Sequence, residues 1–268
     1  MSVSPMQYRR FAPFFIALLV SMFVFPGAVD AQISDINDAI NKAGRERMLS
    51  QRIAKSYLQI GQGIDPERSR RVLDASMALF DRQLVELKNY APTPEIRHTY
   101  MELERVWIAY KDLLVGVAPN LRSAPEVLER SDQVLALAHL GTVQLESLSA
   151  TTSGYLVNIA GRQRMLSQRM ARNYQAMAWG LVDTGLGAEL DVLRAEFSAA
   201  LDELSVYRGN SSRINDRLAL VRQQWIFFED ALNQRDPGNE SLALNVATTS
   251  ERILEVMEEV VAMYEAVD

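Results

Sequence analysis

Cysteine is absent from the 268-residue sequence, and histidine occurs only twice. Without cysteine the chain can form no disulfide, no thiolate zinc site and no iron–sulfur cluster. The two histidines, His98 and His139, lie far apart in the sequence, whereas a catalytic zinc ion usually has three protein ligands. We therefore expect no metal site and no cofactor.

The sequence also lacks an excess of positive charge and, after its first 31 residues, any long apolar run. The net charge is -6, which argues against a general nucleic-acid-binding surface, because such surfaces are basic. No later stretch approaches the roughly 20 apolar residues that a membrane-spanning helix needs. With 48% hydrophobic residues, which is ordinary for globular proteins, we expect the rest of the chain to fold around one or two cores.

The first 31 residues have the pattern of an export signal. Two arginines precede an apolar run at residues 11–25, and a small-residue cleavage site ends at Ala31. A proline interrupts the run, which is short for a spanning helix. We expect export, cleavage after Ala31 and a periplasmic protein that begins at Gln32; the alternative is a signal that is retained as a membrane anchor.

One stretch of the sequence occurs twice. Residues 41–57 read NKAGRERMLSQRIAKSY, and residues 158–174 read NIAGRQRMLSQRMARNY, at an offset of 117 residues. Further matches follow at offsets of 117 to 119, including Phe80 with Phe197, Trp107 with Trp225 and Ser131 with Ser250. Self-similarity at a fixed period indicates that whole structural units are repeated. We therefore expect two units, at residues 32–150 and 151–268.

Each unit is predicted to contain four helices. Helix-start signals, in which a capping residue precedes proline and glutamate, occur at Asp65, Thr93 and Ser123. The segments between them show helical periodicity and no strand alternation. Short connections favour antiparallel neighbours, so the expected fold is all-α, with two tandem antiparallel four-helix bundles. The predicted helices are 34–61 and three that start near residues 65, 93 and 123, then 153–182, 188–207, 214–234 and 239–266.

The connection between the two units could itself be helical. No proline occurs between Ser131 and Gly180, so the last helix of the first unit could continue into the first helix of the second. Three glycines in this stretch weaken that continuity, at about 1 kcal/mol each relative to alanine. We also expect Trp107 and Trp225 to be core residues.

An arginine lies on the small, apolar face of each motif helix. At about 100° per residue, Arg47 shares a face with Ala43 and Gly44, and Arg164 has the equivalent surroundings. An unpaired buried charge is costly, and a small anion would satisfy a guanidinium group well. The alternative is that each arginine pairs with an acid on another helix or reaches water. The candidate ligand-binding residues are Arg47, Gly44, Ser50 and Gln51 in the first copy and Arg164, Gly161, Ser167 and Gln168 in the second.

Further basic residues make both motif helices locally positive in an acidic chain. They are Arg45, Arg52 and Lys55, with Arg162, Arg169 and Arg172 in the second copy. Such a cluster could focus an anion toward the site, or it could form a solvated helix face.

The repeated motif resembles the P-box of NarX-type nitrate/nitrite sensor kinases and the related N-terminal sensor domain of PilJ-type methyl-accepting transducers. The resemblance covers essentially the whole chain after residue 31 and occurs in two tandem copies. It implies a dimeric four-helix sensor domain in which nitrate lies between the two first helices and is held by the motif arginine. Carried onto this sequence, that arginine is Arg47 in one copy and Arg164 in the other, with Gly44 and Gly161 at the close approach.

Two features differ from the family pattern: the motif occurs twice in one chain, and the sequence ends after its second unit. We hypothesise that the units form an internal pseudo-dimer in which Arg47 and Arg164 share one anion, so that replacing either with alanine abolishes binding. The alternative is an end-to-end arrangement in which each unit needs a second chain, as in a homodimer.

The leading functional hypothesis is a non-enzymatic periplasmic sensor or binding protein for a small inorganic oxyanion, nitrate or nitrite first, that acts in signal transduction or chemotaxis. Its state would pass to a separate membrane transducer or sensor kinase. The alternative is a helical scaffold that docks to a transducer or a pilus-related partner without a ligand. The sequence shows no Ser-His-Asp set, metal cluster or glycine-rich phosphate loop, so no enzyme class is supported.

Overall fold

The computed structural model describes Met1 and residues 32–181, 185–234, 236 and 238–266. The rest of the predicted export signal, residues 2–31, lies outside the described residues. Within them the chain forms eight α-helices and no strand, which confirms the all-α prediction. Gln32–Asp268 forms one compact unit. None of the helices in the described part combines the length and the apolar character needed to span a membrane.

The helices begin and end close to the predicted positions. In chain order they are α1 (Ile36–Gln62), α2 (Pro66–Tyr90), α3 (Pro94–Leu114), α4 (Ala124–Ser149), α5 (Thr152–Ala178), α6 (Leu186–Val206), α7 (Ser212–Asn233) and α8 (Glu240–Glu265). Thr93 caps α3 as expected, because its hydroxyl accepts a hydrogen bond from Ile96 N at 3.3 Å. Asp65 and Ser123 precede α2 and α4, but their side chains make no capping hydrogen bond.

Helix α4 does not continue into α5, so the helical connection that the sequence left open does not form. Ala150 adopts a left-handed conformation with φ of 49°, and its N–H still bonds to Glu146 O at 3.0 Å. Thr151 then caps the next helix by accepting a hydrogen bond from Gly154 N at 3.1 Å. A left-handed alanine costs about 1–2 kcal/mol. Helices α4 and α5 contact each other less than each of them contacts its other neighbours.

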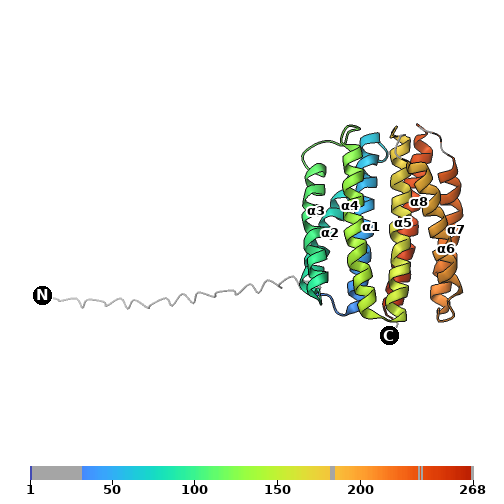
Figure 1. Cartoon of the computed structure of the whole chain (residues 1–268). Helices are drawn as coiled ribbons and strands as arrows, with labels where there is room; N and C mark the ends of the chain where they lie inside the picture. Colours follow the sequence, from blue (N-terminus) through green and yellow to red (C-terminus); the bar gives the residue numbers. More distant parts are fainter. Residues whose placement is uncertain (2–31, 182–184, 235, 237, 267–268) are drawn as a thin grey trace. The chain divides into compact units, whose positions relative to one another are not determined.

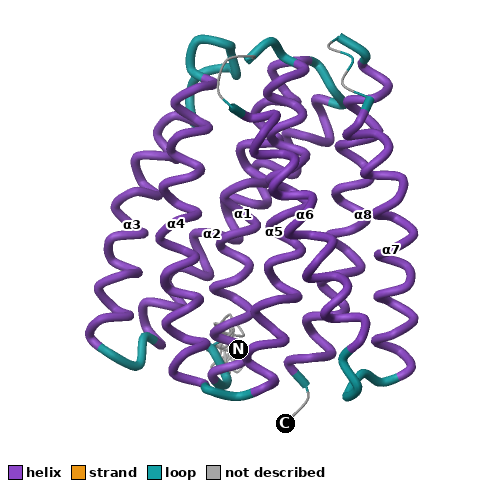
Figure 2. Tube along the Cα trace, turned by 45° about the vertical axis from the view of Figure 1, so that its right-hand side comes forward, coloured by secondary structure: helices purple, strands orange, loops and turns teal. Residues whose placement is uncertain are grey.

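The two motif helices, α1 and α5, lie at the centre of the helical unit (Figures 1 and 2). They form the most extensive contact between any two helices. Helix α1 also packs against α2 and α4, and α5 packs against α6 and α8, while α3 lies on α4 and α7 on α8. Figure 1 shows α2 and α3 on one side of this centre and α6 and α7 on the other. The grouping into two four-helix bundles, with a boundary at residues 150 and 151, stays a prediction.

Helices α1 and α5 run parallel and nearly in register. Asn37 donates a hydrogen bond to Ser153 at 3.2 Å near their start, and Gln62 donates one to Gln175 O at 3.1 Å near their end. The contacting residues are separated in sequence by 116 and 113 positions, close to the repeat offset. The duplicated motif therefore meets its own copy along the whole length of the two helices.

Stacked aromatic pairs anchor the outer helices. Trp107 of α3 stacks on Phe80 of α2 with ring centroids 4.1 Å apart, and Trp225 of α7 stacks on Phe197 of α6 at 4.4 Å. Both tryptophans are buried, which confirms the core role predicted for them. The repeat thus reproduces side-chain packing as well as helix order.

We expect Trp225→Ala to lower the free energy of unfolding by about 3–5 kcal/mol, because truncating a buried aromatic ring leaves a cavity. The neighbouring Ile226 is 61% exposed on the same helix, and Ile226→Ala should change stability by less than about 0.5 kcal/mol. Urea unfolding followed by circular dichroism measures both. Equal effects of the two substitutions would contradict the assignment of Trp225 to the core.

Candidate functional site

The two motif arginines meet in the space above the two motif glycines. Arg47 and Arg164 are both fully buried. A Cβ atom added to Gly44 would lie 3.1 Å from Arg47 Nη2 and 3.5 Å from Arg164 Nη2, and one added to Gly161 would lie 3.1 Å and 3.7 Å from Arg164 Nη2 and Arg47 Nη2. The sequence predicted that the glycines admit a neighbouring backbone. In the structure the nearest atoms belong to the guanidinium groups, so the glycines make room for two charges.

Each arginine is held by the asparagine of the other copy. Arg47 Nη2 donates to Asn158 Oδ1 at 2.7 Å, and Arg164 Nη2 donates to Asn41 Oδ1 at 3.0 Å. The asparagine Nδ2 groups in turn donate to glutamates, Asn41 to Glu265 of α8 and Asn158 to Glu146 of α4. Sequence reasoning missed both asparagines as site residues, although asparagine opens both copies of the motif.

The Nη1 groups have different partners in the two copies. Arg164 Nη1 contacts Glu258 of α8 at 2.5 Å, whereas Arg47 Nη1 contacts the ring nitrogen Nδ1 of His139 at 3.3 Å. Glu258 also accepts two hydrogen bonds from Arg45, at 3.1 and 3.0 Å. Within the described residues, no carboxylate forms an ion pair with Arg47. Arg164 therefore pairs directly with a carboxylate inside the protein, whereas Arg47 is linked to Glu146 only through Asn158.

The electrostatic environment of the two arginines reflects this difference. Burial, together with the nearby charge of Arg164, lowers the pKa of Arg47 to about 9. Burial also lowers the pKa of Arg164, but Glu258 opposes the shift. For Glu258 itself burial acts to raise the pKa, and Arg164 and Arg45 outweigh it and lower the pKa to about 2. The Nε atoms of both motif arginines have no hydrogen-bond partner, so the site retains unused donor capacity beside excess positive charge.

The acid nearest to Arg47 in the sequence does not neutralise it. Glu46 is fully buried, and neither of its carboxylate oxygens has a hydrogen-bond partner. Burial raises the pKa of Glu46 well above its usual value, which favours the neutral form. The equivalent residue in the second copy is the neutral Gln163, which donates to Phe197 O at 2.9 Å.

The remaining predicted ligand-binding residues are used within the protein. Ser50 and Ser167 donate to the carbonyl oxygens of Arg47 and Arg164, at 2.8 Å each. The side chains of Gln51 and Gln168 donate to backbone carbonyls of α4 and α8, at 3.1 and 3.0 Å. The structure thus brings Arg47, Arg164, Gly44 and Gly161 together, and it directs the serines and glutamines toward helix backbones.

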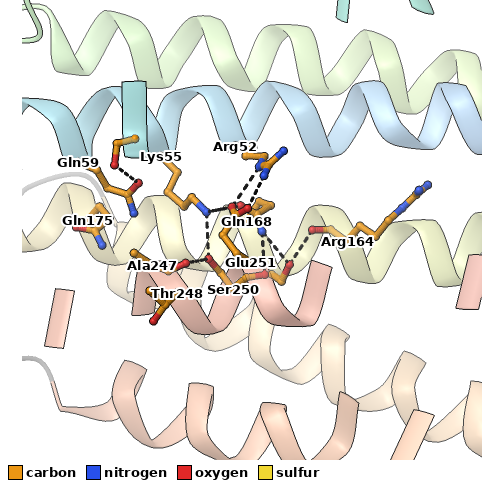
Figure 3. Close-up of polar contacts among 12 residues, drawn as sticks. Arg52, Lys55, Gln59, Arg164, Gln168, Gln175, Ala247, Thr248, Ser250 and Glu251 are labelled. Carbon is orange, nitrogen blue, oxygen red and sulfur yellow. Dashed lines mark hydrogen bonds and ion pairs between the residues drawn. The ribbon is translucent and has the colours of Figure 1, made fainter. Parts of the chain in front are cut away.

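A second polar cluster ties the motif helices to α4 and α8. Lys55 is buried and donates to Glu251 at 2.5 Å, to Ser250 at 3.1 Å and to Gln168 at 2.6 Å. Figure 3 shows Lys55, Arg52 and Gln168 directed toward Glu251 and Ser250, while the guanidinium group of Arg164 points away from them. In the other copy, Arg172 contacts Asp132 at 2.6 Å and Ser131 at 3.0 Å.

These contacts revise the interpretation of the basic motif residues. Lys55 and Arg172 neither form a solvated face nor lie free to attract an anion, because each is buried and paired with an acid. Each motif helix directs its cation to a helix on which an acid lies, Lys55 of α1 to α8 and Arg172 of α5 to α4. The ion pairs therefore link α1 to α8 and α5 to α4.

A groove of about 410 Å³ lies beside Arg47, between α4, α5 and α6. Its lining includes His139 and Glu146 from α4, Asn158 and Arg162 from α5, and Glu196 from α6. His139 is exposed and contacts the buried Arg47, so its ring separates the guanidinium group from solvent. No cluster of three histidine, aspartate or glutamate side chains able to hold a metal ion occurs in the described part of the chain.

We expect Glu251→Gln to lower the free energy of unfolding at pH 7 by about 3–5 kcal/mol, because it leaves the buried Lys55 without its counter-charge. Glu255 lies one turn further along α8 and is exposed, so Glu255→Gln should have an effect below about 0.5 kcal/mol. Denaturant unfolding of both variants tests this; an unchanged stability in Glu251→Gln would show that the pair does not link the helices.

The same pair predicts a dependence of stability on pH. Burial acts to raise the pKa of Glu251, but Lys55 and Arg52 outweigh it and lower the pKa from 4.5 to about 2. A carboxylate with a depressed pKa in the folded state stabilises the protein fully above its unfolded pKa, and this contribution is lost as the pH falls toward the folded pKa. The difference in stability between wild type and Glu251→Gln should therefore shrink between about pH 4.5 and pH 2. A difference that stays constant over this range would contradict the assignment.

Comparison with known proteins identifies the family. Residues 31–138 and 148–249 match the family model PilJ, described as the N-terminal domain of type IV pili methyl-accepting chemotaxis transducers. No protein with a curated description and no solved structure matches the chain. The matched segments cover well over half of the sequence and include both copies of the motif, α1 and α5. The chain therefore belongs to the PilJ family of transducer N-terminal domains, a family of sensory and signalling modules.

Proposed function

We propose that this protein is a periplasmic, non-enzymatic sensor that binds a small inorganic oxyanion, nitrate or nitrite first, between α1 and α5. The observation that carries the proposal is the pair of fully buried, adjacent guanidinium groups of Arg47 and Arg164, of which only Arg164 contacts a carboxylate. A buried charge without a counter-charge is costly. A bound anion would supply that charge and accept hydrogen bonds from the planar guanidinium fork.

The proposed arrangement is an internal pseudo-dimer of two four-helix units, α1–α4 and α5–α8. Helices α1 and α5 would correspond to the first helices of two subunits in a dimeric sensor. The parallel, in-register contact of the two helices supports this reading. The reciprocal hydrogen bonds, from Arg164 to Asn41 and from Arg47 to Asn158, support it as well. In this arrangement the anion site is complete within one chain.

A change in the α1–α5 contact would carry the signal. A ligand shifts a conformational equilibrium only by binding one state more tightly than the other. Two adjacent cations repel each other, and an anion near them favours the state in which they lie close together. We propose that the resulting change in the packing of α1 and α5 passes to a separate membrane transducer or sensor kinase, a role that membership of a transducer family supports.

A second reading, a helical scaffold without a ligand, is favoured by one specific observation. Arg164 is already paired with Glu258, and an arginine satisfied inside the protein needs no anion. In this reading the motif copies serve to dock the two units, and the exposed surface contacts a transducer or a pilus-related partner. This reading does not explain why the buried guanidinium group of Arg47 forms no ion pair within the described residues.

Calorimetric titration with nitrate, nitrite, chloride and sulfate separates the two readings. We expect nitrate or nitrite to bind to the wild type, and binding to fall at least about 10- to 100-fold in Arg47→Met/Arg164→Met, because each lost charge-assisted hydrogen bond is worth about 1.5–3 kcal/mol. Arg105 is exposed on α3, and Arg105→Met should bind like the wild type.

Unfolding curves of the same variants provide the control for folding. Absence of binding by a folded wild type would reject the anion sensor and favour the scaffold. Undiminished binding by the folded double variant would show that the anion lies elsewhere.

A further inference from the structure

The two copies of the site differ at one position whose side chain contacts the motif arginine. Five pairs of repeat-equivalent residues lie around the two arginines: Asn41 and Asn158, Arg45 and Arg162, Arg47 and Arg164, Glu146 and Glu265, and His139 and Glu258. The first four pairs carry the same residue in both copies. Only His139 and Glu258 differ, and both contact the Nη1 atom of the motif arginine in their own copy.

Glu258 places a permanent negative charge in one half of the site. Its carboxylate accepts from Arg164 Nη1 at 2.5 Å and from Arg45 Nε and Nη2 at 3.1 and 3.0 Å. This is the contact pattern that a small anion would make in the same place. The carboxylate side chain thus fills the position at Arg164 that a ligand would otherwise take.

The equivalent position at Arg47 holds no carboxylate. The groups that face the His139 ring are Arg47 of α1, Arg162 of α5 and Glu196 of α6, and burial and the two arginines lower its pKa, which favours a neutral ring. Arg162 does not turn toward the site as Arg45 does, because it pairs with Glu196 at 2.9 Å. Arg47 is therefore left with only neutral partners.

The groove beside Arg47 provides a route to this position. It is lined by Arg47 and His139 and opens between α4, α5 and α6. The contact between His139 and Arg47 is a single one of 3.3 Å, which an anion can replace with a stronger, charge-assisted hydrogen bond. Three glutamates also line the groove, Glu146, Glu196 and Glu203, and they repel a ligand with two negative charges more strongly than one with a single charge.

Resting on the anion-binding function proposed above, we propose that Glu258 is a built-in counter-ion for Arg164 and that one exogenous monovalent anion binds at Arg47 in the place equivalent to the Glu258 carboxylate. The site is thus asymmetric and takes a single anion per chain. Because a carboxylate fills the other half, the ligand class is a planar monoanion with two oxygens directed at a guanidinium group. Nitrate, nitrite and small carboxylates such as formate belong to this class, and sulfate does not.

Exchanging the two residues tests the asymmetry. His139→Glu gives Arg47 its own internal carboxylate, and we expect nitrate affinity to fall roughly 10- to 100-fold, as for the loss of one charge-assisted hydrogen bond. Glu258→His exposes Arg164, and we expect the stoichiometry in titrations with nitrate to rise from one anion per chain to two. The double exchange, His139→Glu/Glu258→His, keeps the composition of the site and should restore a single anion at Arg164.

The outcomes separate failure of this inference from failure of the proposed function. A folded wild type that binds neither nitrate, nitrite nor formate overturns the anion-binding function itself. If the wild type and His139→Glu bind nitrate equally tightly, or if the wild type binds two anions per chain, the anion-binding function stands and the asymmetric site is overturned. Loss of binding in His139→Glu with recovery in the double exchange supports the inference, and a denaturant unfolding curve of His139→Glu checks that this variant is folded.

Discussion

Two like charges buried side by side between α1 and α5 are the constraint on which the rest of the structure depends. A buried guanidinium group loses its hydration, and the loss is recovered only through hydrogen bonds and counter-charge. Each motif helix presents an asparagine to the arginine of the other copy, and α4 and α8 place glutamates behind those asparagines. The central helices must therefore keep one register, because a shift of either would leave both arginines without partners.

The same logic extends along the interface to Lys55 and Arg172. Each crosses to an acid on α8 or α4, helices that the sequence assigned to the opposite unit. An apolar interface between two amphipathic helices tolerates some sliding, whereas paired buried charges do not. We interpret these ionic contacts as the feature that specifies how α1 meets α8 and how α5 meets α4, while the aromatic pairs of Trp107 and Trp225 join α3 to α2 and α7 to α6.

The sequence predicted the helices well because the signals that define them are local. Proline, glutamate and capping residues mark the starts of α2 and α3, and the periodic apolar residues need only their own helix to be recognised. The sequence left a continuous helix across Ala150 open because no glycine or proline marks this left-handed residue. The hydrogen bonds of Ser50 and Gln51 could not be predicted for another reason: their partners depend on helix packing, and either side chain can donate to a backbone carbonyl or to an anion.

The difference between His139 and Glu258 shows what a duplicated chain can do that a symmetric dimer cannot. In a dimer of identical subunits, a carboxylate introduced beside one motif arginine appears beside the other as well, and both charges are neutralised together. After duplication within one chain, each half changes separately, so Arg164 can acquire Glu258 while Arg47 stays uncompensated. One internal counter-ion reduces the repulsion between the arginines and, in the site proposed above, leaves one position open to a ligand. A buried Arg47 without an ion pair in the described part of the chain is thus compatible with a stable fold, because the neighbouring Arg164 is already paired with Glu258.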